Sequence, residues 1–446
     1  MTPDLALRGG LLVTSAGIVV ADLAVENGSI VGVGEVGAAR HEVSADSLHV
    51  FPGLIDAHVH FNEPGRTHWE GFASGSAALA AGGGTLFLEM PLNADPPLLT
   101  PDTFAAKRAA AERSSLTDFA FWGGLTPDNL DQLEPLAACG VVGFKAFMAN
   151  SGIPEFRAAD DLTLLEGMCR AAALGLPVAV HAESEALTGA LSARIRSAGG
   201  RGVSDYSASR PVVAELEAIQ KALLFAEETG AEVHVVHVST ARGVQLVREA
   251  AARGVRATCE TCPHYLYFSE NDLQRADPRR SAALKCAPPL RSERERSALL
   301  NALEHLDLIA SDHSPAPPDL KTSEDFFEVW GGISGVQATL LVLLSLGVTP
   351  ERVAALSAEG PAKRFRLAKG RLEAGCDADF TLVDLDGTTT FDAKTTLTRY
   401  KDGAYSGKTF RGRVRATYLR GQAVVADGAV VAAPSGKLVC PERKPQ

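Results

Sequence analysis

The sequence predicts an α/β fold, a (β/α)₈ TIM barrel with a small β-sandwich domain formed by both chain ends. From about residue 51, short apolar runs alternate with alanine-rich helical segments, which indicates parallel strands covered on both faces. Eight such runs occur within roughly 310 residues, a span typical of a (β/α)₈ barrel with insertions. Alternating apolar and polar residues characterise both ends of the chain, as in antiparallel sheets.

The first part of the β-sandwich is predicted over residues 1–50, with Asn27-Gly28 as a hairpin turn. The barrel is predicted over residues 51–366. Its candidate strands are LIDAHVH, TLFLEMP, DFAFWGG, VVGFKAF, LPVAVHAE, AEVHVVHVS, VRATCETCP and LDLIASDH. Intervening segments such as FAAKRAAAERS have helical composition. Residues 367–446 return to a β-like pattern, so we expect them to complete the sandwich and form the tail.

Composition narrows the possible partners and the location. The chain has 446 residues, of which 46% are hydrophobic and 22% charged, as in ordinary globular proteins. A net charge of −11 without a basic run argues against nucleic acid and anionic membranes as partners. No stretch resembles a signal peptide or reaches the ~20 apolar residues of a membrane helix. Seven scattered cysteines suggest reduced thiols, so we expect a cytoplasmic protein.

Metal-compatible side chains recur at the predicted carboxyl ends of the barrel strands, where the active sites of such barrels lie. His58 and His60 end the first strand and, two residues apart, share one face of it. The others are Lys145, His181, His237 and Asp312, in the fourth, fifth, sixth and eighth strands. Imidazole and carboxylate groups that converge on one mouth predict a divalent-metal site.

Lys145 is unlike the other members of this set. A protonated ammonium beside divalent cations would be repelled, whereas a buried lysine readily loses its proton. A neutral Lys145 can react with carbon dioxide to form a carbamate, N6-carboxylysine, whose two oxygens could bridge two metals. The alternative is a Lys145 ammonium that pairs with Asp312.

Strand periodicity separates the remaining histidines. His234 and His237 are three residues apart, so we expect them to face opposite ways. We expect His237 to point into the barrel and His234 to be structural. His313 follows Asp312 directly, so we expect it to face away from the mouth and to have a supporting role at most.

The ordered set HxH, Lys, His, His, Asp resembles the amidohydrolase superfamily, and within it the cyclic amidases, which include dihydroorotases, hydantoinases and allantoinases. The resemblance covers almost the whole chain and is greatest to the allantoinases. The stretches that support it are HFNEPGRTHWEGF, EMPLN, GVVGFKAF, DYSASRP, TCPHYL, KCAPPLR, SDHSP, WGGISG and GCDADF.

This resemblance implies a binuclear centre. One divalent ion would be held by His58, His60 and Asp312, and the other by His181 and His237, with carboxylated Lys145 and a hydroxide as bridges. We expect zinc first, although manganese, cobalt and iron suit the same ligands. Asp312 would act as general base and then acid while the cyclic amide of allantoin opens to allantoate, a step of purine breakdown. The resemblance also implies a homotetramer.

Substrate choice depends on residues around this centre. Dihydroorotases typically carry an arginine two residues after the HxH motif, where this chain has Asn62. The missing guanidinium disfavours a substrate that bears a carboxylate. Further candidates to contact the ring and ureido groups are Asn93, the backbone around Cys286, Ser314 and Gly332. Arg66 and His68 are candidates to line the mouth.

Other functions remain open at this point. A hydantoinase or dihydropyrimidinase is the main alternative, although hydantoinases usually place a tyrosine near the position of Asn150. A dihydroorotase and a non-catalytic relative fit less well, the latter because all six ligand positions are filled. The Cys259–Cys262 CxxC motif lacks a second pair, and the AAGGGTL stretch lacks the GK[ST] of a phosphate loop. Neither is expected to form a site.

Overall fold

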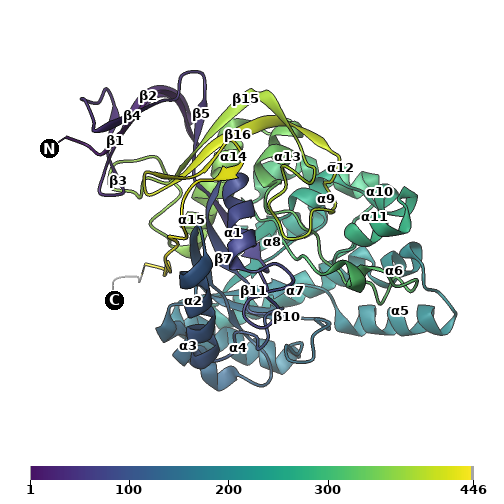
Figure 1. Ribbon diagram of the computed structural model, residues 1–446. Helices are drawn as coiled ribbons and strands as arrows, with labels where there is room; N and C mark the ends of the chain where they lie inside the picture. The colour runs from purple at the N-terminus through teal and green to yellow at the C-terminus, as the bar shows by residue number, and fades with distance from the viewer. Residues whose placement is uncertain (1, 443–446) are drawn as a thin grey trace.

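The computed structural model describes residues 2–442, and its central feature is the predicted barrel (Figure 1). The barrel strands are β6 (Leu54–Val59), β7 (Gly84–Glu89), β8 (Asp118–Phe121), β9 (Gly123–Gly124), β10 (Phe144–Phe147), β11 (Pro177–His181), β12 (Glu232–Val235), β13 (Ala257–Thr261) and β14 (Leu308–Ile309). Strands β8 and β9 flank Trp122 and occupy one barrel position. A parallel bridge between Val59 and His313 joins β6 to the segment after β14 and closes the ring. All eight predicted strands lie in this barrel, so the predicted fold class is confirmed.

Helices surround the barrel and cover its outer face (Figure 1). They are α1 (Phe72–Ala81), α2 (Pro101–Ser114), α3 (Leu133–Cys139), α4 (Asp161–Leu174), α5 (Glu185–Ser197), α6 (Val203–Ser209), α7 (Val212–Thr229), α8 (Ala241–Ala252), α9 (Pro263–Tyr267), α10 (Glu270–Arg275), α11 (Pro278–Ala283), α12 (Glu293–Asn301), α13 (Thr339–Ser345), α14 (Pro350–Ala354) and α15 (Gly360–Phe365). Local sequence determines where several begin. For example, the Thr100 side chain accepts a hydrogen bond from the Thr103 N–H at the start of α2, which satisfies a free donor of the first turn.

Side-chain alternation along the strands divides the apolar residues into two layers. Phe87 packs in the outer cluster with helix residues, whereas Leu86 and Leu88 pack inside the barrel with Trp122 and Phe365. Phe365 belongs to α15, and its neighbour Arg364 binds Glu232, the first residue of β12. Helix α15 therefore covers the amino-terminal ends of the strands. The apolar core fills that half of the barrel and leaves the carboxyl-terminal mouth for polar residues.

Both chain ends form one further sheet beside the barrel. Its strands are β1 (Leu5–Thr14), β2 (Gly17–Glu26), β3 (Ser29–Gly34), β4 (His41–Ser44), β5 (His49–Pro52), β15 (Phe380–Thr390), β16 (Thr409–Leu419), β17 (Gln422–Ala426) and β18 (Ala429–Val430). Antiparallel pairing of β5 with β15 joins the two ends. The predicted turn at Asn27-Gly28 connects β2 and β3, and both residues have positive φ, as a tight hairpin requires. The exact division at residues 50/51 and 366/367 stays a prediction.

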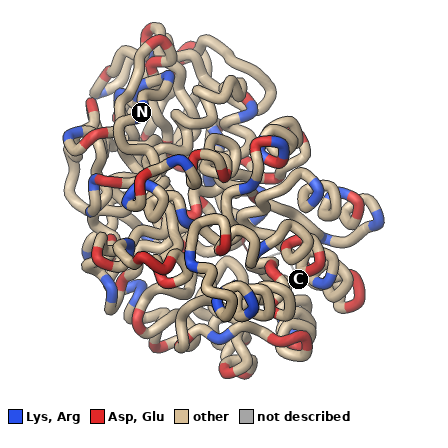
Figure 2. Tube along the Cα trace, turned by 90° about the vertical axis from the view of Figure 1, so that its right-hand side faces the viewer, with Lys and Arg blue, Asp and Glu red and all other residues tan. Residues whose placement is uncertain are grey.

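Charged residues are interspersed along the whole trace (Figure 2). Among the described residues, no helix combines the length and the apolar character that a membrane crossing requires.

Candidate active site

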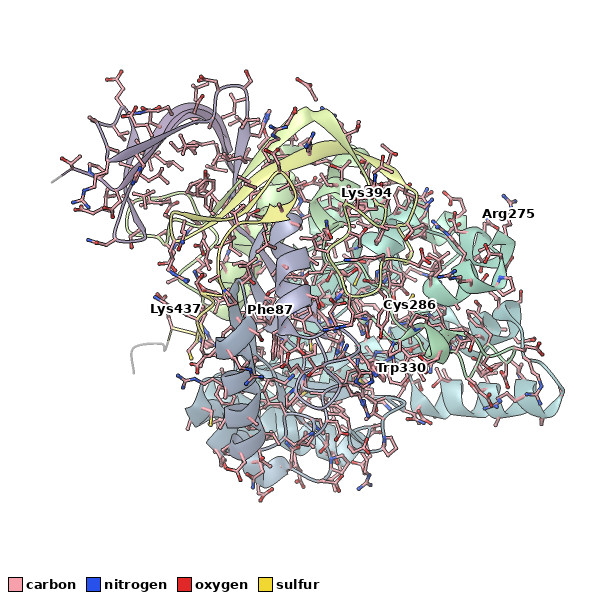
Figure 3. All side chains as sticks on the ribbon, viewed as in Figure 1. Phe87, Arg275, Cys286, Trp330, Lys394 and Lys437 are labelled. Atoms are coloured by element: carbon pink, nitrogen blue, oxygen red, sulfur yellow. The ribbon has the colours of Figure 1, made fainter. Side chains whose placement is uncertain are left out.

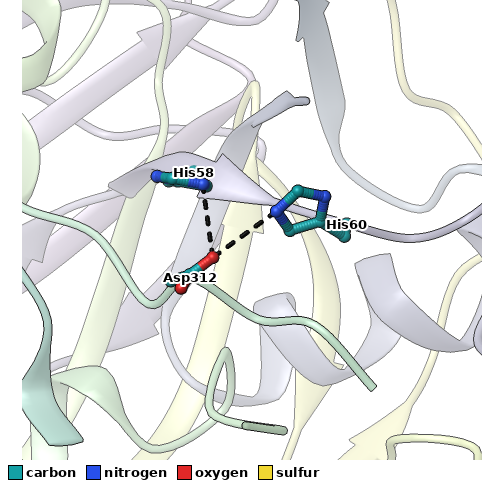
Figure 4. A group of neighbouring side chains, drawn as sticks. All are labelled: His58, His60 and Asp312. Atoms are coloured by element: carbon teal, nitrogen blue, oxygen red, sulfur yellow. Dashed lines mark ion pairs between the residues drawn. The ribbon is translucent and has the colours of Figure 1, made fainter. Parts of the chain in front are cut away.

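The two histidines of the first barrel strand meet the aspartate that follows the last strand (Figure 4). The Nε2 atoms of His58 and His60 lie 3.2 and 3.4 Å from Oδ1 of Asp312. Both histidines are at most 5% exposed. Asp312 has a φ of 46°, a strained conformation for a residue other than glycine, which turns its side chain toward the histidines. One nitrogen or oxygen of each residue lies within 4.8 Å of the others, so the trio could hold one metal ion.

A second pair of histidines lies directly beside this trio. Nδ1 of His181 lies 3.0 Å from Nε2 of His237, close to the ~3.3 Å between two nitrogen ligands of one tetrahedral zinc ion. The rings of His237 and His58 have centroids 5.5 Å apart. Lys145, on β10, is completely buried, and its Nζ lies 5.2 Å from the centre of the Phe147 ring. The structure thus brings all six predicted ligand residues to one mouth, although their roles as ligands stay predictions.

The periodicity argument for the sixth strand is wrong in one respect, because both histidines face the barrel interior. His234 pairs in register with Ala179, whose side chain lies in the inner apolar cluster. Strand β12 ends at Val235, and His237 has a φ of 39°. This left-handed residue breaks the alternation, so His237 also reaches the mouth. Val235 packs in the outer cluster rather than on the side of His237.

The protonation states of the side chains at the mouth are those that bind a metal. Burial is the main cause that lowers the pKa values of His58, His181 and His237, so these imidazoles are neutral, the form that binds metals. Burial also lowers the pKa of Lys145 to about 7. Within the described part of the chain, Lys145 Nζ is buried at the mouth without a hydrogen-bond partner. Buried polar atoms rarely remain unpaired, so the donor set fits bound divalent cations.

Two buried glutamates that sequence reasoning missed support the histidines. Oε1 of Glu260 lies 2.7 Å from Nδ1 of His58, and its Oε2 lies 3.1 Å from Nε2 of His234. Glu183 lies 2.9 Å from Nε2 of His181 and also binds Arg210. A carboxylate on the second ring nitrogen orients a metal-binding histidine. The sequence signal that could have identified Glu260 is an acidic residue within the otherwise apolar strand VRATCETCP. The contact between Glu260 and His234 is what gives His234 its structural role.

Burial raises the pKa of the Glu260 carboxyl to about 8. For Glu183, burial would raise the pKa, but the adjacent Arg210 guanidinium and His181 outweigh burial and lower it to about 2. His313 is buried outside the mouth, where its Nδ1 accepts hydrogen bonds from the N–H groups of Gly335 and Val336. A supporting role for His313 is consistent with these contacts.

The CxxC cysteines do not converge on a site of their own. Cys262 and His264 offer atoms within 4.8 Å of a carboxylate oxygen of Asp312. Both Cys259 and Cys262 pack in the outer apolar cluster. Burial raises the pKa of the Cys262 thiol far above its usual value, which keeps the thiol neutral.

A cavity of about 340 Å³ opens above these residues. It is lined by His58, His60, His181, His237 and Asp312, and by four predicted substrate contacts, Asn93, Cys286, Ser314 and Gly332. Cys286 and Trp330, both labelled in Figure 3, line this same cavity. The Asn93 amide donates a 3.3 Å hydrogen bond to the Ser314 hydroxyl.

Three other candidates lie outside this lining. Asn62 is fully buried, and its amide donates a 3.4 Å hydrogen bond to the Pro315 carbonyl. Arg66 packs over the Trp69 ring, and His68 is exposed. Contacts of Asn62 with a substrate therefore stay a prediction, and they would require the cavity wall to move.

Comparison with known proteins gives one consistent result. The amidohydrolase family matches residues 49–424. The chain is 53% identical to a protein from Deinococcus radiodurans named allantoinase, over 99% of both chains. It is 50% identical to one of the same name from Solibacter usitatus, over 98% of this chain and 97% of that one. An L-hydantoinase (dihydropyrimidinase) structure from Arthrobacter aurescens matches with a TM-score of 0.94 and 34% identity, over 98% of this chain and 100% of that one. The chain therefore belongs to the amidohydrolase family.

Proposed function

We propose that this protein is an allantoinase, which hydrolyses the cyclic amide of allantoin to allantoate. The full-length identity of 50–53% to proteins named allantoinase is the observation that carries the proposal. The cavity adds chemical support, because its lining includes four histidines and Asp312 beside the neutral amide of Asn93 and hydroxyl of Ser314. Such groups can bind an uncharged hydantoin ring and its ureido tail.

Two divalent cations fit the mouth. His58, His60 and Asp312 would hold one, His181 and His237 the other, and Lys145 carboxylated on Nζ would bridge them. When bound, such ions polarise an amide carbonyl and lower the pKa of water. The chain itself contributes buried, neutral imidazoles oriented by Glu260 and Glu183, and a lysine whose lowered pKa makes its amine available to carbon dioxide.

Asp312 is the proposed proton carrier. Its carboxylate would take a proton from the attacking water, while the water oxygen forms a bond with the amide carbon. The carbon–nitrogen bond of the ring then breaks, and Asp312 returns the proton to the leaving nitrogen. The side chain of Asp312 is 13% exposed, so it borders the cavity that would hold the ring.

A parallel hydrolysis assay tests the substrate. Metal-loaded protein would be offered allantoin, hydantoin, dihydrouracil and dihydroorotate under identical conditions. We expect allantoin to have the highest kcat/KM. A higher value for hydantoin or dihydrouracil would favour the hydantoinase alternative, which the structural similarity to an L-hydantoinase raises. A higher value for dihydroorotate would contradict the role assigned to Asn62.

We further propose zinc as the metal, a homotetramer as the assembly and the cytoplasm as the location. The histidine-rich donor set suits zinc, and no disulfide forms among the described cysteines, as expected in a reducing compartment. Elemental analysis of the purified protein and sedimentation of the metal-loaded form would test the first two.

A further inference from the structure

One wall of the cavity is formed by residues 326–332, here called the wall segment. Residues 327–332 all line the same cavity as the histidines of the mouth. The wall segment belongs to no helix or strand, so no regular hydrogen-bond ladder fixes its shape. Its backbone carbonyls must therefore find other donors, because buried carbonyls are rarely left unpaired.

Two lysines bind these carbonyls. Lys285 Nζ donates hydrogen bonds to the carbonyls of Phe326 (2.6 Å), Phe327 (3.2 Å) and Val329. Its side chain is 4% exposed, and its Nζ lies 4.5 Å from the centre of the Tyr206 ring. Burial is the main cause that lowers the pKa of Lys285 to about 7, and in its protonated form the amine uses all three donors on this one short segment.

Lys321 binds the rest of the wall segment in the same way. Its Nζ donates hydrogen bonds to the carbonyls of Trp330 (3.1 Å), Gly332 (2.9 Å) and Ala282 (3.1 Å). The two lysines together bind five carbonyls of the wall segment. Within residues 2–442 these five carbonyls have no other hydrogen-bond donor.

The same segment reaches the predicted substrate contacts. The Gly332 N–H donates a 2.7 Å hydrogen bond to the carbonyl of Lys285, the residue before Cys286. Gly332 has a φ of 144°, and a Cβ at this position would lie 2.1 Å from the Ser314 carbonyl oxygen. The wall segment is therefore bonded to the residue before Cys286 and lies against Ser314, and any movement of it would change the pocket that Cys286 and Ser314 line.

We propose that Lys285 and Lys321 are positioning residues that hold the wall segment against the cavity and thereby determine which cyclic amides bind. This inference rests on the proposed function, since the pocket it shapes is the one that would hold allantoin. The geometry favours a role in the pocket over one in the core, because the partners of both ammonium groups are mainly carbonyls of a pocket wall. Neither lysine lies among the predicted metal ligands, so metal binding should not depend on them.

The test uses Lys285→Met and Lys321→Met in the metal-loaded protein, with the exposed Lys394→Met (Figure 3) as a matched control. We expect KM for allantoin to rise about tenfold in each pocket variant, since hydrogen bonds to a charged group are lost. We expect kcat and metal content to change less than about threefold. KM for hydantoin, which lacks the ureido tail, should rise less. Lys321→Arg should keep KM near the wild-type value, because it retains a cation with several donors.

A second measurement needs no substrate. Trp330 lies in the wall segment, and its ring packs against Trp69 with centroids 4.7 Å apart. The Trp330 signal is isolated by comparing each variant with a second form that also carries Trp330→Phe. In the methionine variants we expect the acrylamide quenching constant of Trp330 to be at least about twofold higher, because its ring becomes more accessible to the quencher. Folded variants with wild-type KM and wild-type quenching would overturn the proposal, as would equal losses of kcat and bound metal. A wild-type protein inactive on allantoin would refute the proposed function, while the quenching result would still test the two lysines.

Discussion

Two buried lysines of this molecule have opposite surroundings. Lys145 lies at the barrel mouth, where its Nζ has no hydrogen-bond partner within the described residues, and burial lowers its pKa to about 7. Lys369 is 4% exposed and lies 2.6–2.8 Å from carboxylate oxygens of Asp118, Asp377 and Asp379. Burial alone would lower its pKa as well, but the three carboxylates outweigh burial and raise the pKa above its usual value.

The difference in surroundings indicates that Lys145 has a chemical role and that Lys369 has a structural one. Asp118 begins the barrel strand β8, and Asp379 directly precedes β15 of the sheet, so Lys369 links the two parts of the fold. A buried cation with several carboxylate partners is compensated for its lost hydration. Lys145 forms no hydrogen bond or ion pair within the described residues, and a buried titratable group without such compensation beside a cavity is typical of functional sites.

The largest expected effect is that of Lys145→Ala on activity. Removal of the amine removes the proposed bridge, and we expect kcat/KM for allantoin to fall about a thousandfold, since metal ions contribute several kcal/mol to such reactions. The metal content should fall with it, whereas the free energy of unfolding of the metal-free protein should not decrease. Partial recovery of activity with added acetate or propionate would support a carboxylate bridge. Full activity of the variant would exclude the binuclear arrangement.

Lys369→Met should lower the stability of the protein and leave its activity nearly unchanged. Loss of the ammonium leaves buried aspartates without their cation, and we expect the free energy of unfolding to fall by about 3–5 kcal/mol. Arg420 remains beside Asp118, which favours the lower end of that range. Denaturation by urea measures the loss, with the exposed Lys363→Met as control. Activity per folded, metal-loaded molecule should stay within about twofold; a large loss would show that Lys369 also affects the mouth.

Glu260→Gln tests the support around the mouth. The amide keeps the size of the side chain but removes the carboxylate that Glu260 carries above its raised pKa of about 8 and that holds Nδ1 of His58, so at pH 9 we expect the zinc affinity to fall between about ten- and a hundredfold. Competition with a chelator measures this affinity, with the exposed Glu228→Gln as control. An unchanged affinity would mean that Glu260 serves only His234 and the core.

Much of the fold was predictable because each barrel strand corresponds to a separate apolar run in the sequence. Lys145 and His181 were predicted from their places near the ends of two apolar runs, and these runs form β10 and β11, which pair in parallel. His237 did not follow, because its left-handed φ beyond the end of β12 is a local backbone choice that no spacing reveals. His237 does reach the mouth, but the periodicity argument that predicted this fails for His234, which also faces the barrel interior.

The supporting residues were harder to predict for a different reason. Glu260 bonds His58 across 202 positions of sequence, and only the closed barrel brings them together. Lys285 and Lys321 bind carbonyls, which every residue possesses, so no side-chain pattern marks their targets. Sequence reasoning thus finds groups that share a strand end, and it misses contacts that depend on the path of a loop.

The smallest expected effect concerns pH and distinguishes the two lysines directly. With a pKa of about 7, the amine of Lys145 is neutral in about 10% of molecules at pH 6 and about 90% at pH 8. Carboxylation needs the neutral amine and releases a proton, so the extent of ¹³C-carbamate formation in metal-free protein, measured by NMR at constant dissolved carbon dioxide, should rise at least about tenfold over this range. Lys145→Met should show no such signal, and Lys369, protonated throughout, should not react.

The stability of the metal-free protein should depend on pH for the same reason. Between pH 7 and 10.5 Lys145 binds a proton in the unfolded chain but not in the folded protein, so the free energy of unfolding should rise with pH in this window. A fall across that window, or carbamate formation that ignores pH, would show that Lys145 is charged in the folded protein and paired with Asp312.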